Sequence, residues 1–146
     1  MISAQNASVH VRHSFAASAQ AVFDAWLDPE LLGMWMFHPT IQNEEVINIE
    51  IDGKKGGAFR FSVRRDGRVH EYTGTYLDLR RPEQLVFTWI SETEPRNTVV
   101  SVTIVQTGSG CEVNVVHELG EVADEMIRRV ETRWQAELGA LSTTLN

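Results

Sequence analysis

Residues 58–76 read AFRFSVRRDGRVHEYTGTY, and this stretch decides the fold. Apolar and polar side chains alternate on both sides of Asp66-Gly67, which is the period of two half-buried strands. Asp-Gly between two such runs is a strong signal for a tight hairpin turn. The stretch therefore predicts an antiparallel hairpin that gathers its aromatic side chains on one face.

Further strands are expected on both sides of this hairpin. Glycine, proline and polar residues separate them, as in Gly108-Ser109-Gly110, and Glu92–Asn97 is expected to be a polar loop. The other predicted strand segments are residues 9–15, 46–51, 85–89, 100–104 and 111–117. Apart from the first, these segments follow one another as a consecutive antiparallel meander.

Two short helices and one long helix complete the prediction. Ser18 offers an N-cap for the first short helix, and Asp28-Pro29 offers a cap and a first residue for the second. At the C-terminal end the apolar residues recur at helical spacing, which predicts a long amphipathic helix from about Val122 to Leu145 that packs on the sheet with Val130, Trp134 and Leu141 buried. Its apolar positions are Val122, Met126, Ile127, Val130, Trp134, Leu138, Leu141 and Leu145.

Length and composition indicate one globular domain over residues 1–146. The chain is 42% hydrophobic and 23% charged, and its formal charge is −7, which argues against nucleic acid and anionic lipid as partners. Its single cysteine, Cys111, rules out an internal disulfide, and residues 1–8 do not resemble a secretory signal. We therefore expect a cytoplasmic protein that neither spans nor binds a membrane. The basic pairs Lys54-Lys55, Arg64-Arg65 and Arg128-Arg129 are interpreted as solvated turns and faces rather than as one patch.

The order of strand, two short helices, meander and long helix resembles the START-like (SRPBCC) superfamily, the fold type of the birch-pollen allergen. Within it, the chain is similar to the family of homologues of the activator of a heat-shock chaperone ATPase. The similarity is carried by Phe15–Ser18, Val22–Glu30 with Trp35, Gly56–Phe61, Gly74–Tyr76, Pro82–Trp89 and Val113–His117. The resemblance implies an α+β helix-grip fold, in which a curved antiparallel sheet surrounds the long C-terminal helix and a small-molecule cavity.

The chain departs from this family at two positions. A usual Gly-Trp of the long helix reads Arg133-Trp134, and a usual threonine after the glycine-rich turn reads Cys111. Both positions are expected near the cavity wall, so they bear on the ligand more than on the fold. Cys111 itself is expected to be an inert buried thiol.

Alternation and helical spacing together predict the ligand site. The expected cavity-lining residues are Phe61, Tyr72, Tyr76, Phe87, Trp89, His117, Met126, Val130 and Trp134. Aromatic walls supply apolar area, and a few polar tips orient a ligand. The two short helices, with Trp26 and Trp35, are expected to close one end. The alternative is that these side chains simply fill the core, and this alternative is stronger for phenylalanine and valine than for the residues with polar tips.

The candidates for acid or base chemistry are His117 and His70, which face inward by alternation. His117 can equally be a satisfied core histidine that braces the helix. No metal site is expected, because His10 and His13 lie on opposite faces of a strand. No cofactor is expected either, because the sequence has no phosphate-binding loop and no dinucleotide-binding glycine pattern.

Three functions remain open at this level. The first is a module that binds a small, largely apolar molecule, and the second is an enzyme of the cyclase or dehydratase kind that uses the same cavity. The third is a stress-response module that contacts a chaperone, which only the family resemblance suggests. The identity of the ligand and the oligomeric state, including a homodimer, are left open by the sequence.

Overall fold

The computed structural model describes residues 5–38, 44–91 and 98–145. Its elements are, in chain order, β1 (Gln5–Phe15), α1 (Ala19–Leu27), α2 (Pro29–Trp35), β2 (Glu45–Ile51), β3 (Ala58–Arg65), β4 (Arg68–Arg80), β5 (Gln84–Ser91), β6 (Thr98–Thr107), β7 (Gly110–Val122) and α3 (Asp124–Leu145). This order confirms the predicted helix-grip fold. The loop expected over Glu92–Asn97 lies outside the described residues.

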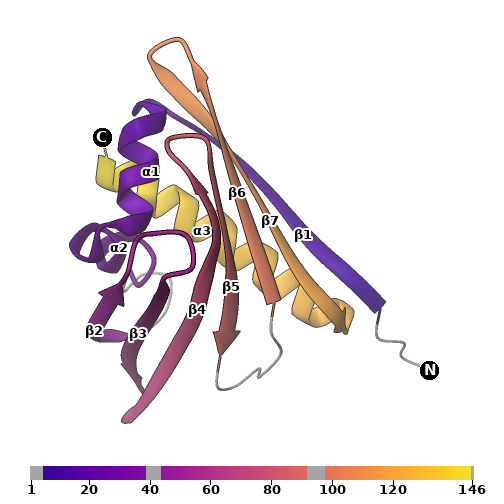
Figure 1. The fold of residues 1–146 in the computed structure, drawn as a ribbon. Coiled ribbons are helices and arrows are strands. Elements are labelled where there is room, and N and C mark those ends of the chain that lie inside the picture. The colour runs from indigo at the N-terminus through magenta and orange to yellow at the C-terminus, as the bar shows by residue number, and fades with distance from the viewer. Residues whose placement is uncertain (1–4, 39–43, 92–97, 146) are drawn as a thin grey trace.

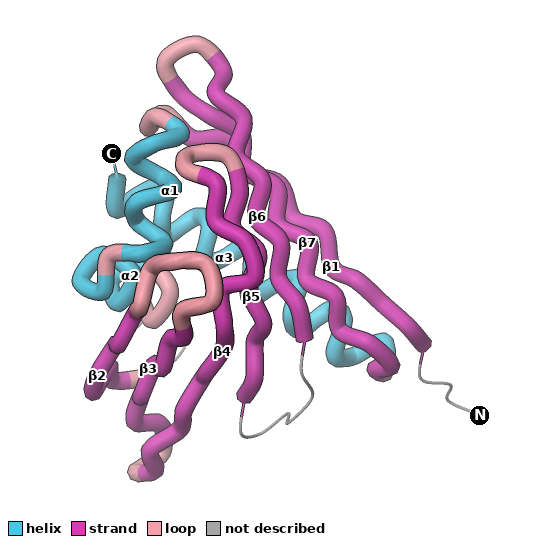
Figure 2. The backbone as a smooth tube through the Cα atoms, in the orientation of Figure 1, coloured by secondary structure: helices cyan, strands magenta, loops and turns pink. Residues whose placement is uncertain are grey.

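The seven strands form one antiparallel sheet in the order β1-β7-β6-β5-β4-β3-β2. Strands β2 to β7 follow one another as the predicted meander, while β1 pairs with β7 at the opposite edge. The sheet is curved, and α3 crosses one of its faces (Figure 1). The tube in Figure 2 shows that α1 and α2 lie at the same end of the molecule as the C-terminal part of α3. The sheet and the three helices therefore enclose the core between them.

Local sequence signals explain where the elements begin and turn. Asp66 and Gly67 both have positive φ, 53° and 77°, as a tight Asp-Gly hairpin turn requires. Ser18 Oγ accepts a hydrogen bond of 3.2 Å from the backbone N–H of Ala21 and so caps α1. Asp28 Oδ1 accepts one of 2.9 Å from the N–H of Glu30 and caps α2, which has a proline at its first position.

Tryptophans join the short helices to the rest of the core. The rings of Trp26 and Trp35 meet edge to face at 4.6 Å, and Trp26 also lies 6.3 Å from Phe87 and 5.9 Å from Trp134. Trp26 and Trp35 are both buried. The short helices therefore close one end of the space between the sheet and α3.

The long helix begins two residues later than predicted. Val122 still belongs to β7, because it pairs with Gln5 at the end of β1, and helical geometry starts at Asp124. Trp134 and Leu141 are buried as predicted, whereas Val130 is half-buried. No helix in the described part of the chain is both long enough and apolar enough to cross a membrane.

One glycine of the sheet is required by close packing. A Cβ atom built on Gly74 in β4 would overlap the carbonyl oxygen of Thr88 and the ring of Phe59. Gly74 is therefore required because the ring of Phe59 packs directly against the strand backbone at this position.

Candidate functional site

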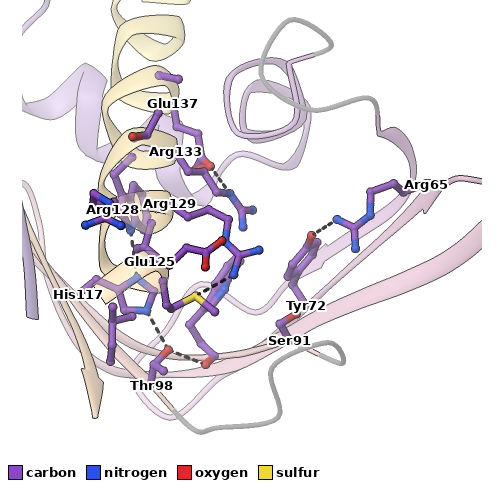
Figure 3. A pocket seen from close by; sticks show the side chains of 17 residues that line it. Arg65, Tyr72, Ser91, Thr98, His117, Glu125, Arg128, Arg129, Arg133 and Glu137 are labelled. Carbon is purple, nitrogen blue, oxygen red and sulfur yellow. Dashed lines mark hydrogen bonds and ion pairs between the residues drawn. The ribbon is translucent and has the colours of Figure 1, made fainter. Parts of the chain in front are cut away.

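A pocket of about 990 Å³ lies between α3 and the ends of strands β3 to β7. Figure 3 shows its side chains converging from the helix on one side and from the sheet on the other. The lining residues are Arg65, Tyr72, Trp89, Ser91, Thr98, His117, Leu119, Glu125, Met126, Arg128, Arg129, Val130, Thr132, Arg133, Trp134, Ala136 and Glu137. A volume of this size is at the upper end of the range for small-molecule sites.

The structure brings six of the nine predicted lining residues to this pocket. They are Tyr72, Trp89, His117, Met126, Val130 and Trp134. The other three, Phe61, Tyr76 and Phe87, line a separate cavity of about 10 Å³ beside Trp26. That end of the aromatic face is filled because α1 and α2 pack on it. His70 is half-buried opposite Val63 and does not line the pocket.

The sheet side of the pocket is an aromatic wall. The rings of Tyr72 and Trp89 are stacked, with centroids 5.1 Å apart and an interplanar angle of 24°. The guanidinium carbon of Arg133 lies 5.4 Å from the centroid of Tyr72 and 6.0 Å from that of Trp89. Arg133 therefore makes cation–π contacts with both rings.

His117 is the middle of a hydrogen-bonded chain across four elements. The indole Nε1 of Trp134 donates to His117 Nδ1 at 3.1 Å, and His117 Nε2 lies 2.8 Å from Thr98 Oγ1. Thr98 Oγ1 in turn donates to the carbonyl of Trp89 at 2.8 Å. Because an indole can only donate, Nδ1 must accept. The proton of the neutral imidazole therefore sits on Nε2 and is donated to Thr98.

This arrangement decides what His117 can do. Burial, with a smaller contribution from Arg133, lowers the pKa of His117 to about 4, so the ring is neutral near pH 7. Each ring nitrogen already has a protein partner. The geometry therefore favours a structural role for His117, in which it joins β6, β7 and α3, over a role as an acid or base that acts on a ligand.

Sequence reasoning missed a buried ion pair on α3. Arg133 Nε donates to Glu137 Oε2 at 2.8 Å, and the Glu137 side chain is only 2% exposed. Burial raises the pKa of Glu137 to about 7 against the opposing effect of Arg133. A signal for the pair was present, because an arginine and a glutamate four residues apart interrupt the apolar side of the helix.

A second pair stands on the other side of the aromatic wall. Arg65 Nη1 donates to Glu44 Oε2 at 3.0 Å and lies 3.4 Å from the hydroxyl of Tyr72, which donates to the same carboxylate at 2.9 Å. Burial, more than any neighbouring charge, raises the pKa of Tyr72. Arg65 lies on the same face of β3 as Phe59, because the two are an even number of positions apart, and this alternation could have predicted that it points inward.

The basic pairs do not all mark solvated faces. Arg65, Arg128 and Arg129 come from two of the predicted pairs, and the fold brings them to the rim and wall of one pocket. Arg128 and Arg129 are exposed, as the interpretation of solvated faces predicts, whereas the Arg65 side chain is only 28% exposed and is paired with Glu44.

Cys111 lies away from the site. It is buried where β7 pairs with Phe15 of β1, does not line the pocket, and burial raises its pKa. The expectation that Cys111 is near the cavity wall was therefore wrong, while Arg133, the other departure from the family pattern, does line it. Across the described ranges, no group of three or more histidine, cysteine, aspartate or glutamate side chains is arranged to hold a metal ion.

Solved structures with the same fold are numerous, and three of them illustrate the similarity to this chain. CV1439 from Chromobacterium violaceum has a TM-score of 0.81 at 23% identity, covering 94% of this chain and 96% of that one. The AHSA1-like protein from Aeromonas hydrophila has a TM-score of 0.75 at 16% identity, covering 94% and 91%. CalU16 from Micromonospora echinospora has a TM-score of 0.70 at 22% identity, covering 95% and 76%. These similarities support the fold alone.

Curated proteins gave no significant match to the chain. The model of one protein family, described as Activator of Hsp90 ATPase homolog 1-like protein, matches residues 16–146, which is most of the sequence. The match agrees with the fold and with the segments that carried the resemblance. The chain belongs to the family of Activator of Hsp90 ATPase homolog 1-like proteins.

Proposed function

We propose that this protein binds a small, largely apolar molecule in the pocket between the sheet and α3. The observation that carries the proposal is the pocket of about 990 Å³ between the stacked rings of Tyr72 and Trp89 and the helix. The helix contributes the adaptable Met126 and the branched Val130 to the pocket lining. Apolar walls with a few fixed polar groups are the usual composition of a small-molecule site.

The surroundings of the pocket favour a preformed site. Trp134 and His117 are fixed by their hydrogen bond, and Arg133 is held by Glu137. Side chains that are already fixed lose little conformational entropy when a ligand binds. A binding role therefore needs no rearrangement of this wall.

An enzyme of the cyclase or dehydratase kind needs an acid or a base that reaches the ligand. His117 has both ring nitrogens engaged, and His70 does not line the pocket. Glu137 does line it, but its carboxylate is buried against Arg133. These observations favour binding over acid–base chemistry. The family description is the support for a chaperone contact, and no feature of the pocket gives further support for one.

A fluorescent probe tests the proposal. N-Phenyl-1-naphthylamine is uncharged and brightens when it leaves water, so titration of the wild-type protein should give a saturable increase in fluorescence. Val130→Trp places an indole in the pocket and should abolish the increase. Val105→Trp is the matched control, because Val105 is 51% exposed on β6 and does not line the pocket.

Two results would contradict the proposal. One is a wild-type protein that leaves the probe fluorescence unchanged, and the other is equal probe binding by the Val130→Trp and wild-type proteins. Circular dichroism of both variants would check that the fold is retained.

A further inference from the structure

The charges that line the pocket have the opposite sign to the charge of the chain. Four arginines line it, against two glutamates, whereas the whole protein carries a formal charge of −7. The four arginines are Arg65, Arg128, Arg129 and Arg133. Figure 3 shows Arg128, Arg129 and Arg133 on the helix side of the pocket and Arg65 on the opposite side. A concave, partly apolar site focuses such a local excess of positive charge toward its interior.

In both buried ion pairs, the arginine is the partner that a ligand can reach. The Arg65 side chain is 28% exposed and that of Glu44 is 0% exposed, while Arg133 is 27% exposed and Glu137 is 2% exposed. The carboxylates therefore lie inside the wall and orient the guanidinium groups from behind. The surface that the two pairs present to the pocket is therefore cationic.

The position of Arg133 connects this charge with the apolar wall. Its guanidinium lies over both Tyr72 and Trp89, at 5.4 and 6.0 Å from their ring centroids. A ligand whose apolar body lies along these rings consequently has one end beside the guanidinium. The planar fork of arginine matches the two oxygens of a carboxylate or the oxygens of a sulfonate.

We infer that the ligand of this pocket is an amphipathic organic anion, with its apolar body on the Tyr72–Trp89 wall and its acidic group against Arg133. The inference rests on the proposed function and adds the chemical class of the ligand. Arg133 is then the residue that selects for charge. The carboxylate of Glu137 competes with the ligand for Arg133, because it already accepts a hydrogen bond from the guanidinium.

Two probes with one aromatic frame test the inference. 8-Anilino-1-naphthalenesulfonate carries a sulfonate, and N-phenyl-1-naphthylamine is the same frame without it. The sulfonate probe should bind roughly tenfold or more tightly than the neutral probe, the order of magnitude expected for a hydrogen bond to a charged group. Arg133→Gln should reduce this preference to about one, because the sulfonate then loses its charged partner. Glu137→Gln should increase the preference.

Arg12→Gln is the matched control. It removes the same charge from an exposed position on β1 that does not line the pocket, and it should leave both affinities unchanged. If Arg133→Gln does not fold, the dependence of probe binding on ionic strength is measured on the wild-type protein instead. Raising the salt concentration from about 0.01 M to about 0.15 M should weaken the sulfonate probe and spare the neutral one.

The outcomes separate the two proposals. Equal affinities for the two probes in the wild-type protein would overturn the inference and leave the proposed function standing. Failure of both probes to bind would overturn the proposed function. A preference for the sulfonate probe that survives both Arg133→Gln and added salt would overturn the assignment to Arg133.

Discussion

Trp134 Nε1 donates a hydrogen bond of 3.1 Å to His117 Nδ1, and this bond links α3 to strand β7 of the sheet. It also requires the imidazole to remain an acceptor, since the indole has no lone pair to offer. Protonation of His117 would place two N–H groups face to face. The bond therefore exists only while His117 is neutral.

The first prediction concerns acid stability through His117. Its pKa of about 4 in the folded protein lies below the ordinary value of 6.5. The unfolded chain therefore binds more protons between these values, and the free energy of unfolding falls as the pH drops from 6.5 to 4. We expect the stability advantage of wild type over His117→Gln to shrink by about 3 kcal/mol over this window, measured by urea unfolding at a series of pH values.

The second prediction has the opposite sign and concerns Glu137. Its pKa of about 7 lies above the ordinary value of 4.5, so the folded protein binds the extra proton between these values. The contribution of Glu137 is present below pH 4.5 and is lost as the pH rises to 7. Relative to Glu137→Gln, wild type should lose on the order of 3 kcal/mol between pH 4.5 and 8.

These two groups titrate in overlapping windows, which provides an internal control. From pH 4.5 to 6.5 their effects oppose each other, so the two single variants should tilt the stability profile in opposite directions. The double variant should return toward the wild-type profile. Two single variants that tilt the same way would contradict the opposite titrations of His117 and Glu137.

The period of the sequence was enough to predict the strands, the meander of β2 to β7 and the long helix, but not the pairing of β1 with β7. Alternation depends only on the pleat of a strand, so it placed Tyr72 and Trp89 on the inner face without further information. The same rule could not separate pocket from packed core. Phe61 and Phe87 obey it as well as Trp89, yet α1 and α2 cover them, and this coverage depends on helix placement in three dimensions.

The ion pairs show a second limit of sequence reasoning. Arg65 and Glu44 are 21 residues apart, and their contact depends on the pairing of β2 with β3 and on the chain before β2. Arg133 and Glu137 are only one helical turn apart, but their burial depends on what faces the helix. Charged residues inside a fold are rare enough that composition alone predicts them to be exposed.

The third prediction compares two glycines. Gly74→Ala should destabilise the protein by several kcal/mol, because the new methyl group overlaps the backbone of Thr88 and the ring of Phe59. Gly139→Ala is the matched control, since a Cβ there has no atom within 4 Å and the residue is inside α3. This second change should stabilise the protein by up to about 1 kcal/mol. Thermal unfolding of both variants checks the pair, and a harmless Gly74→Ala would refute the close packing.

The fourth prediction compares two buried tryptophans. Trp35 Nε1 donates to the carbonyl of Ala25 at 3.1 Å, whereas the buried Trp26 Nε1 has no hydrogen-bond partner among the described residues. Trp35→Phe removes a satisfied bond, but Trp26→Phe removes a donor that is already unsatisfied. Trp26→Phe should therefore be the milder change by about 1 to 3 kcal/mol in chemical unfolding. An equal cost for both would show that Trp26 Nε1 is satisfied.

The division between filled core and pocket also divides the tryptophans into two optical classes. Two of the four, Trp26 and Trp35, belong to the closed end, while Trp89 and Trp134 form part of the pocket lining. A molecule bound as proposed would contact the second class directly, whereas Trp26 would sense it only through Trp134, whose ring lies 5.9 Å away. The emission of the unlabelled protein should thus report occupancy of the pocket, and replacing Trp89 and Trp134 by phenylalanine should remove most of that response.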